Sequence, residues 1–205
     1  MTVRVPPGRA GRLWLRRRLA TATTATSLLE QKLRTLQQEH RRLELRAQHT
    51  AGQWRDSAAE AGRWLIRAEL AGGQRAIRLA TTADLADVTV TWKTSMGVSY
   101  PVEGTVTPPR RAQGTAVSGG GAVVRAAEAH QRALEAAVRH AVATEALRVV
   151  EREIATTRQR VRALDRRWIP ELRTTLAELE LALEEQDRAE GLARRRAVRN
   201  AEVSP

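Results

Sequence analysis

The feature of this sequence that most restricts its fold is a run of apolar and small residues whose spacing alternates strictly between four and three. The run comprises Leu15, Leu19, Ala22, Thr26, Leu29, Leu33, Leu36, His40, Leu43 and Ala47. This spacing is typical of the a and d positions of a coiled-coil helix, in which the polar Thr26 and His40 are expected to set the register. Only isolated glycines interrupt the segment between Gly8 and Gly72. The pattern therefore predicts one helix over about residues 10–70, roughly 90 Å long at 1.5 Å per residue.

A second helical pattern begins at Ala122 and persists to about Arg199. Its strongest stretch comprises Val161, Leu164, Trp168, Leu172, Leu176, Leu179 and Leu183. Pro170 lies inside this stretch, lacks a backbone N–H and would clash with the carbonyl of Arg166, so we expect a kink or a local split of the helix. Two helices of similar length on either side of a short segment suggest an antiparallel pair whose termini meet at one end.

The middle segment loses the helical period and gains a strand period. Val88, Val90 and Trp92 alternate with threonines, and Val98, Tyr100 and Val102 alternate again after Met96-Gly97. This pattern predicts a β-hairpin with Pro101 on an edge strand, and such a hairpin should pack on the helices or on a partner because two strands alone are marginally stable. A loose connector is expected from Pro108-Pro109 through Arg110-Arg111 to the glycines at 119–121.

The predicted fold is therefore mainly α, a long antiparallel two-helix coiled coil with a short β-hairpin in its middle. Its expected parts are an N-terminal coiled-coil helix over residues 1–72, the hairpin and connector over 73–121, and a C-terminal coiled-coil helix over 122–205. Aromatic residues make up only 3% of the chain and Phe is absent, which argues against a compact globule with a large core.

Residue types that carry out catalysis do not come together in this sequence. It has no cysteine, and its four histidines, His40, His49, His130 and His140, lack the i, i+4 spacing of a helical metal pair. Neither a phosphate-binding glycine loop nor a nucleophile elbow is present. We therefore expect no catalytic activity, no metal and no cofactor. Neither a signal peptide nor an apolar stretch long enough to span a bilayer is found, and a soluble protein is expected.

The formal net charge is +12, and arginines gather near both termini. They are Arg9, Arg12, Arg16, Arg17 and Arg18 at the start, and Arg194, Arg195, Arg196 and Arg199 at the end. In an antiparallel pair these like charges would repel one another, most strongly at low salt. Two interpretations remain open: an acidic or carbonyl-rich sleeve surrounds this end, or the end is a solvated, fraying terminus.

Three separated motifs resemble one known family. The first contains Leu28-Leu29 and Lys32 within a leucine-rich start that also holds Pro7, Arg9 and Leu13, and the second is the run Met96-Gly97-Val98-Ser99-Tyr100-Pro101. The third is Arg160-Val161-Arg162-Ala163-Leu164-Asp165 followed by Ile169-Pro170, and Leu183-Glu184-Glu185 and the basic run at Arg194 continue it. Together they resemble the D subunit of V-type and A/V-type ATPases, the central rotor shaft. Gly8, Ala25, Glu30, Arg162 and Asp165 depart from the family's pattern, which puts particular polar contacts in doubt rather than the architecture.

The resemblance implies a non-catalytic shaft that transmits torque between the ATP-hydrolysing or ATP-synthesising head and the membrane ion-translocating ring. It implies contacts of Arg9, Arg12, Arg16, Arg194, Arg195 and Arg196 with the bore formed by the catalytic A and B subunits. It also implies that Met96, Gly97, Val98, Tyr100 and Pro101 contact the small F subunit of the stalk, and that a funnel-shaped C or d subunit links the foot to the membrane ring. The chain would then lie on the cytoplasmic side as a peripheral subunit, without direct membrane insertion and without nucleic acid.

Two other classes of function remain as alternatives. The positive charge would suit a coiled-coil protein that binds nucleic acid or an anionic membrane surface, although glutamates are interspersed along both helices and the five tryptophans are scattered. A structural scaffold or chaperone-like coiled coil would instead form a stable homodimer. Salt-sensitive DNA binding would favour the first alternative, and self-association alone would favour the second.

Overall fold

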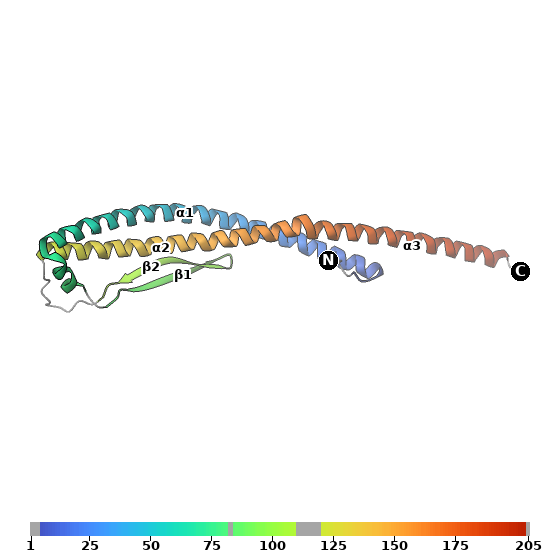
Figure 1. The fold of residues 1–205 in the computed structure, drawn as a ribbon. Coiled ribbons are helices and arrows are strands. Elements are labelled where there is room, and N and C mark those ends of the chain that lie inside the picture. Colours follow the sequence, from blue (N-terminus) through green and yellow to red (C-terminus); the bar gives the residue numbers. More distant parts are fainter. Residues whose placement is uncertain (1–4, 82–83, 110–119, 204–205) are drawn as a thin grey trace. The chain divides into compact units, whose positions relative to one another are not determined.

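The structure, a computed structural model, describes residues 5–81, 84–109 and 120–203. Its elements are helix α1 (Gly8–Ala80), strands β1 (Asp87–Ser95) and β2 (Val98–Thr107), helix α2 (Gly120–Ala163), a π-helical turn (Leu164–Trp168) and helix α3 (Ile169–Val203) (Figure 1). The predicted fold class, long helices packed together with a two-stranded antiparallel hairpin between them, is confirmed. Residues 110–119 of the predicted connector lie outside the described residues. No helix in the described ranges combines the length and the apolar character that crossing a membrane requires.

The chain divides into two compact units. Unit 1 consists of Met1–Leu33 and Thr156–Pro205, and thus holds the start of α1, the end of α2, the π turn and α3. Unit 2 is Arg34–Ala155, which holds the rest of α1, the hairpin and most of α2. Each unit therefore brings together helical segments that lie far apart in the sequence.

In unit 1 a small apolar cluster joins α1 to α3. Leu15 and Leu172 are fully buried and pack with Ala22 and Ile169, while Leu19, Leu176 and Leu179 cover this cluster. Arg9 pairs with Asp187 and Arg16 with Glu180, so higher numbers in α1 face lower numbers in α3 and the two segments run antiparallel. Among the other predicted seam leucines, Leu36 of unit 2 is buried, and Leu29, Leu33, Leu164 and Leu183 are partly buried.

Thr26 occupies a seam position of unit 1 and is only 7% exposed. Its hydroxyl oxygen has no hydrogen-bond partner among the described residues. A buried hydroxyl without a partner loses its hydration and gains nothing in return, so this position weakens the seam locally. The role in register that the sequence suggested for Thr26 stays a prediction.

In unit 2 the seam of α2 is built mainly of alanine. Ala129, Ala136, Ala143 and Val150 recur every seven residues and are each at most 2% exposed. Small side chains at the contact positions let the backbones of two helices approach closely. Polar contacts between α1 and α2 accompany this seam, namely His40 with Glu151, Thr50 with His140, and Glu60 with Arg132. Their numbering again runs in opposite directions, so α1 and α2 are antiparallel in this unit.

Helix α1 is broken at Gly73, which has φ 69° and ψ 170°. Glycine adopts such positive φ values without strain, whereas other residues rarely do. The sequence placed the end of the helical period at Gly72-Gly73, but helix resumes beyond the break and continues to Ala80. The buried Ala76 explains this difference, because it packs with Ala68, Val123 and Ala126 and so anchors the extra helical turns.

Instead of the kink or split expected at Pro170, the structure has a π turn just before the proline. A π turn spans Leu164–Trp168, and the N–H of Ile169 donates to the carbonyl of Leu164, one residue further than in an α-helix. Successive seam residues from Leu164 to Leu176 are each four apart, which would rotate the seam by about 40° per step in an α-helix. A π turn takes up the extra residue and returns the seam towards α1. Helix therefore continues through Pro170, the second residue of α3.

The β-hairpin has longer strands than the sequence suggested and a two-residue turn. Met96 (φ 51°) and Gly97 (φ 74°) form the turn, and both have the positive φ that tight hairpin turns require. Pairing runs from Ser95 opposite Val98 to Asp87 opposite Thr107. A register shift lies between Thr91 and Trp92, where Pro101 pairs opposite Trp92. Proline, which has no N–H to donate to the ladder, is found in sheets at such irregularities.

Candidate functional site

Strand β2 fixes the hairpin to the helices of unit 2. The hydroxyl of Tyr100 donates a 2.8 Å hydrogen bond to Oε1 of Glu39 on α1, and the Tyr100 side chain is fully buried. Gly104 lies so close to α2 that a Cβ there would be 2.6 Å from Cγ1 of Val138 and 2.9 Å from Cγ2 of Val142. The hairpin is therefore anchored to both helices and is not a free arm.

The anchoring changes the acidity of Tyr100, the only tyrosine of the chain. Burial, followed by the hydrogen bond to Glu39 and its negative charge, raises the pKa of Tyr100 to about 12, against an opposing effect of Arg42. The folded state thus holds this proton more tightly than the unfolded state, whose pKa is near 10. The resulting stabilisation is complete below pH 10 and is lost as the pH rises towards 12.

We expect the ultraviolet absorbance of tyrosinate to titrate near pH 12 in the folded chain and near pH 10 in urea. Because Tyr100 is the only tyrosine, the signal needs no assignment. Replacing Glu39 with Gln should move the folded midpoint towards 10, since it removes the negative charge, whereas Glu44→Gln, elsewhere on α1, should not. A folded-state midpoint at 10 would contradict the buried position of Tyr100.

The hairpin residues that the sequence assigned to a partner fall into two groups. Met96 and Gly97 at the tip are exposed. Val98, Tyr100 and Pro101 are buried, and Tyr100 contacts Glu39 of α1. Strand β1 is exposed along almost its whole length, including Val88, Val90 and Trp92, and its outer edge pairs with no strand in the described part of the chain. The surface that the hairpin can offer to a partner is therefore its tip and β1.

The arginines near the two termini, for which the sequence suggested contacts with the bore of the head, differ in their surroundings. Arg9 and Arg16 are paired with Asp187 and Glu180 at 3.2 and 2.6 Å. Arg194 lies 3.6 Å from Glu190 on its own helix. Within the described residues no partner is found for Arg12, Arg195 or Arg196. The carboxylates of α3 therefore offset part of the repulsion expected from the sequence, and the remaining positive charge is available to a partner.

Each histidine makes a structural contact. Nε2 of His40 lies 3.1 Å from Glu151, and its Nδ1 lies 3.9 Å from Glu44. His140 stacks on Trp54 at 5.5 Å and contacts Thr50. His49 bonds to Gln53, and His130 bonds to the carbonyl of Ala126. The contact of His40 with Glu151 joins two helices and residues 111 apart in the sequence. No cluster of three metal-ligating side chains occurs among the described residues.

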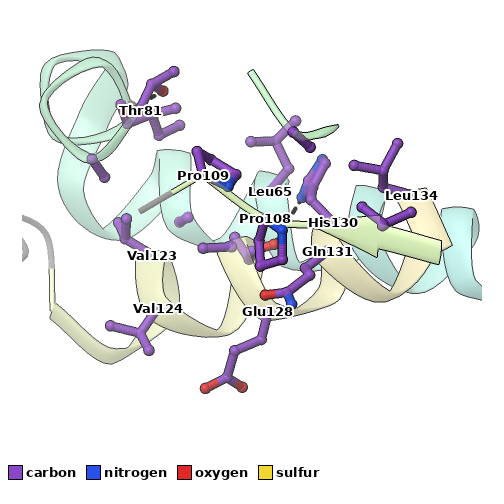
Figure 2. A pocket seen from close by; sticks show the side chains of 17 residues that line it. Leu65, Thr81, Pro108, Pro109, Val123, Val124, Glu128, His130, Gln131 and Leu134 are labelled. Atoms are coloured by element: carbon purple, nitrogen blue, oxygen red, sulfur yellow. Dashed lines mark hydrogen bonds between the residues drawn. The ribbon is translucent and has the colours of Figure 1, made fainter. Parts of the chain in front are cut away.

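An open cavity of about 680 Å³ lies in unit 2 where α1 ends and α2 begins (Figure 2). Its walls are mostly aliphatic, with Leu65 from α1, Val123 and Leu134 from α2, and Pro108-Pro109 after β2. Leu70, Leu79 and Leu85 in the neighbouring segments are between 65 and 90% exposed. Sequence analysis did not identify this apolar surface, whose only sequence signals were the glycine break and the proline pair.

Comparisons with known proteins identify the chain's relatives. The family model of the ATP synthase D subunit matches residues 13–199. The chain is also similar to the D subunit of the A-type ATP synthase of Thermococcus gammatolerans, with 32% identity over 189 residues that cover 90% of this chain and 88% of the relative. The match spans both units and the hairpin, in agreement with the resemblance carried by the three sequence motifs. The chain belongs to the family of ATP synthase D subunits.

Proposed function

We propose that this chain is the rotating central shaft of an A/V-type ATP synthase and carries torque between the catalytic head and the ion-translocating ring. The observation that carries the proposal is the family match over nearly the whole chain. The helices add physical support. From Gly120 to Val203 no non-helical residue interrupts the backbone, because a π turn rather than a break accommodates Pro170. Torque passes along a helix only where no flexible joint absorbs the rotation.

The shaft would itself be non-catalytic and would act through its partners. In this proposal the catalytic A and B subunits enclose the end that carries Arg9, Arg12, Arg16 and Arg194 to Arg196. Three of these arginines lack partners within the described chain, which leaves their charge available to carboxylates or carbonyls of the bore.

Two further partners would bind unit 2. The small F subunit of the stalk would contact the hairpin, whose exposed tip and β1 are held in place by Tyr100 and Gly104. The funnel-shaped subunit would bind the apolar surface around the cavity, where exposed leucines favour burial against a partner. The chain would then be a peripheral subunit on the cytoplasmic side of the membrane.

A site-specific cross-link tests the proposal. The chain has no cysteine, so Arg196→Cys introduces a unique attachment point for a photoreactive cross-linker. Purification through the tagged chain should recover the A and B subunits in excess over it. Illumination should join the chain to one of them, and ATP hydrolysis should fall in proportion to the cross-linked fraction, since a shaft fixed to the head cannot turn.

The dark sample of the same variant is the control and should retain its activity. Recovery of the chain only with copies of itself would refute the proposal. So would full ATP hydrolysis by a completely cross-linked complex.

A further inference from the structure

Strand β1 has a regular backbone edge that is open to another strand. This edge pairs with no strand in the described part of the chain, and the residues from Asp87 to Thr94 are all exposed. The strand is nine residues long and contains neither proline nor glycine. Prolines, bulges and short lengths are usual means by which proteins protect an edge strand from pairing with another chain. Strand β1 has none of these three.

The irregular part of the hairpin lies in β2. Thr91 pairs with Glu103 and Trp92 with Pro101, so the extra residue at the register shift belongs to β2. The alternation of β1 is therefore unbroken. Pro101 cannot donate to the ladder, which indicates that the backbone groups of Trp92, opposite it, point to the open edge. Because strand residues alternate, the backbone groups of Val90 and Val88 point to the same edge.

The two charged residues of β1 lack ionic partners. Asp87 pairs opposite Thr107 and Lys93 opposite Tyr100, and neither forms an ion pair within the described residues. They stand at equal distances before and after Val90. A strand with opposite charges placed in this way is complementary to an antiparallel copy of itself, since each charge then lies opposite the other. A parallel copy would instead bring like charges together.

We propose that two copies of the unassembled chain pair antiparallel through their β1 edges, with Val90 opposite Val90 of the second copy. In this register Asp87 of each copy lies opposite Lys93 of the other. Val88 lies opposite Trp92, so the exposed apolar side chains also meet. The two hairpins then form one four-stranded sheet, and a sheet of three or more strands is more stable than one hairpin.

This pairing goes beyond the proposed function and concerns the chain before it enters the complex. A shaft enclosed by the head is a single copy, and the small stalk subunit would contact the same strand. Assembly therefore separates the two copies. Until then, each copy covers an edge that could otherwise pair with unrelated strands.

Single cysteines in the full-length chain test the register, because the chain has no cysteine of its own. Val90→Cys brings two thiols opposite each other with Cα atoms about 5.5 Å apart, a separation that a disulfide spans. Val88→Cys and Trp92→Cys are the matched controls. Each of these positions lies roughly 13 Å from its own counterpart, at about 3.3 Å per residue over four residues, which is beyond the reach of a disulfide.

Mild oxidation should convert Val90→Cys to covalent dimers and leave each control variant monomeric on a denaturing gel. An equal mixture of Val88→Cys and Trp92→Cys should form the mixed dimer, because these two positions lie opposite each other in the proposed register. Equal cross-linking of all three single variants would indicate random collision and would overturn the proposal.

The charges are tested separately by sedimentation equilibrium. Lys93→Glu and Asp87→Lys should each dimerise about tenfold more weakly than the wild type, because like charges then face each other at both ends of the pair. Mixing the two variants should restore dimers of one copy of each, in which unlike charges again face each other. A tyrosinate titration near pH 12 in every variant checks that the hairpin is still anchored.

Two further results would overturn the pairing. A wild-type chain that is monomeric at every concentration would leave the edge of β1 for a strand of another protein. A dimer that Val90→Cys does not trap and the charge variants do not weaken would place the contact elsewhere, such as the apolar surface around the cavity. The shaft function would stand in both cases, since recovery of the A and B subunits tests it independently.

Discussion

Replacing Leu172 with alanine is expected to lower the free energy of unfolding by about 2–5 kcal/mol. Leu172 is fully buried and lies in the cluster that joins α3 to Leu15 and Ala22 of α1. Removing its side-chain atoms leaves a cavity between two helices whose shared core is small, so few neighbours can move in to fill it. Urea unfolding followed by circular dichroism measures the loss.

A leucine on the exposed side of the same helix provides the control. Leu181 is 57% exposed, and Leu181→Ala changes helix propensity by the same small amount as Leu172→Ala. Its free energy of unfolding should stay within about 0.5 kcal/mol of the wild type. If both variants lost the same stability, Leu172 would not lie at the contact between α1 and α3.

The seam of α1 could be predicted from the sequence because its leucines are apolar and most of the residues between them are charged or polar. Leu15 and Leu36 stand among charged or polar neighbours, and both are buried at positions that the four-and-three spacing selects. The seam of α2 gave no such signal. Ala129, Ala136 and Ala143 are buried, but alanine also occurs on the exposed side of this helix, so its position does not distinguish one face from another.

The sequence predicted the seam positions around Pro170, but it did not predict the π turn. The sequence places Leu164, Trp168 and Leu172 four residues apart and Pro170 between them. Both a kinked helix and a π turn can relieve this arrangement. Trp168 and Leu172 both pack in the cluster with Leu15 of α1, so the contact with α1 continues directly after the π turn.

The hairpin itself could be predicted from its strand alternation and from Met96-Gly97, whereas its place on the helices could not. The contact between Tyr100 and Glu39 joins residues 61 apart in the sequence, and it depends on which side of α1 faces β2. A single glycine, Gly104, permits the approach to α2. Nothing in the sequence distinguished Gly104 from a turn glycine.

Gly104→Ala is expected to lower the free energy of unfolding by about 1–3 kcal/mol and to loosen the hairpin from α2. The added Cβ would lie 2.6 Å from Cγ1 of Val138, a distance that neither β2 nor α2 can accept without moving. Thr105→Ala on the exposed neighbouring residue is the control and should cost much less. Adding Val138→Ala removes the closest methyl group, so Gly104→Ala should cost less in that background than in the wild type.

The pKa of Tyr100 measures the loosening of the hairpin independently of the free energy of unfolding. If the hairpin moves away from the helices, Tyr100 becomes hydrated and loses its contact with Glu39, so its pKa should fall from about 12 towards 10 in Gly104→Ala. The Gly104→Ala, Val138→Ala double variant should return it towards 12. A destabilised Gly104→Ala variant with an unchanged tyrosinate titration would mean that the strain stays local to α2. Unchanged stability together with an unchanged titration would mean that β2 packs against neither Val138 nor Val142, and the anchoring of the hairpin would then rest on Tyr100 alone.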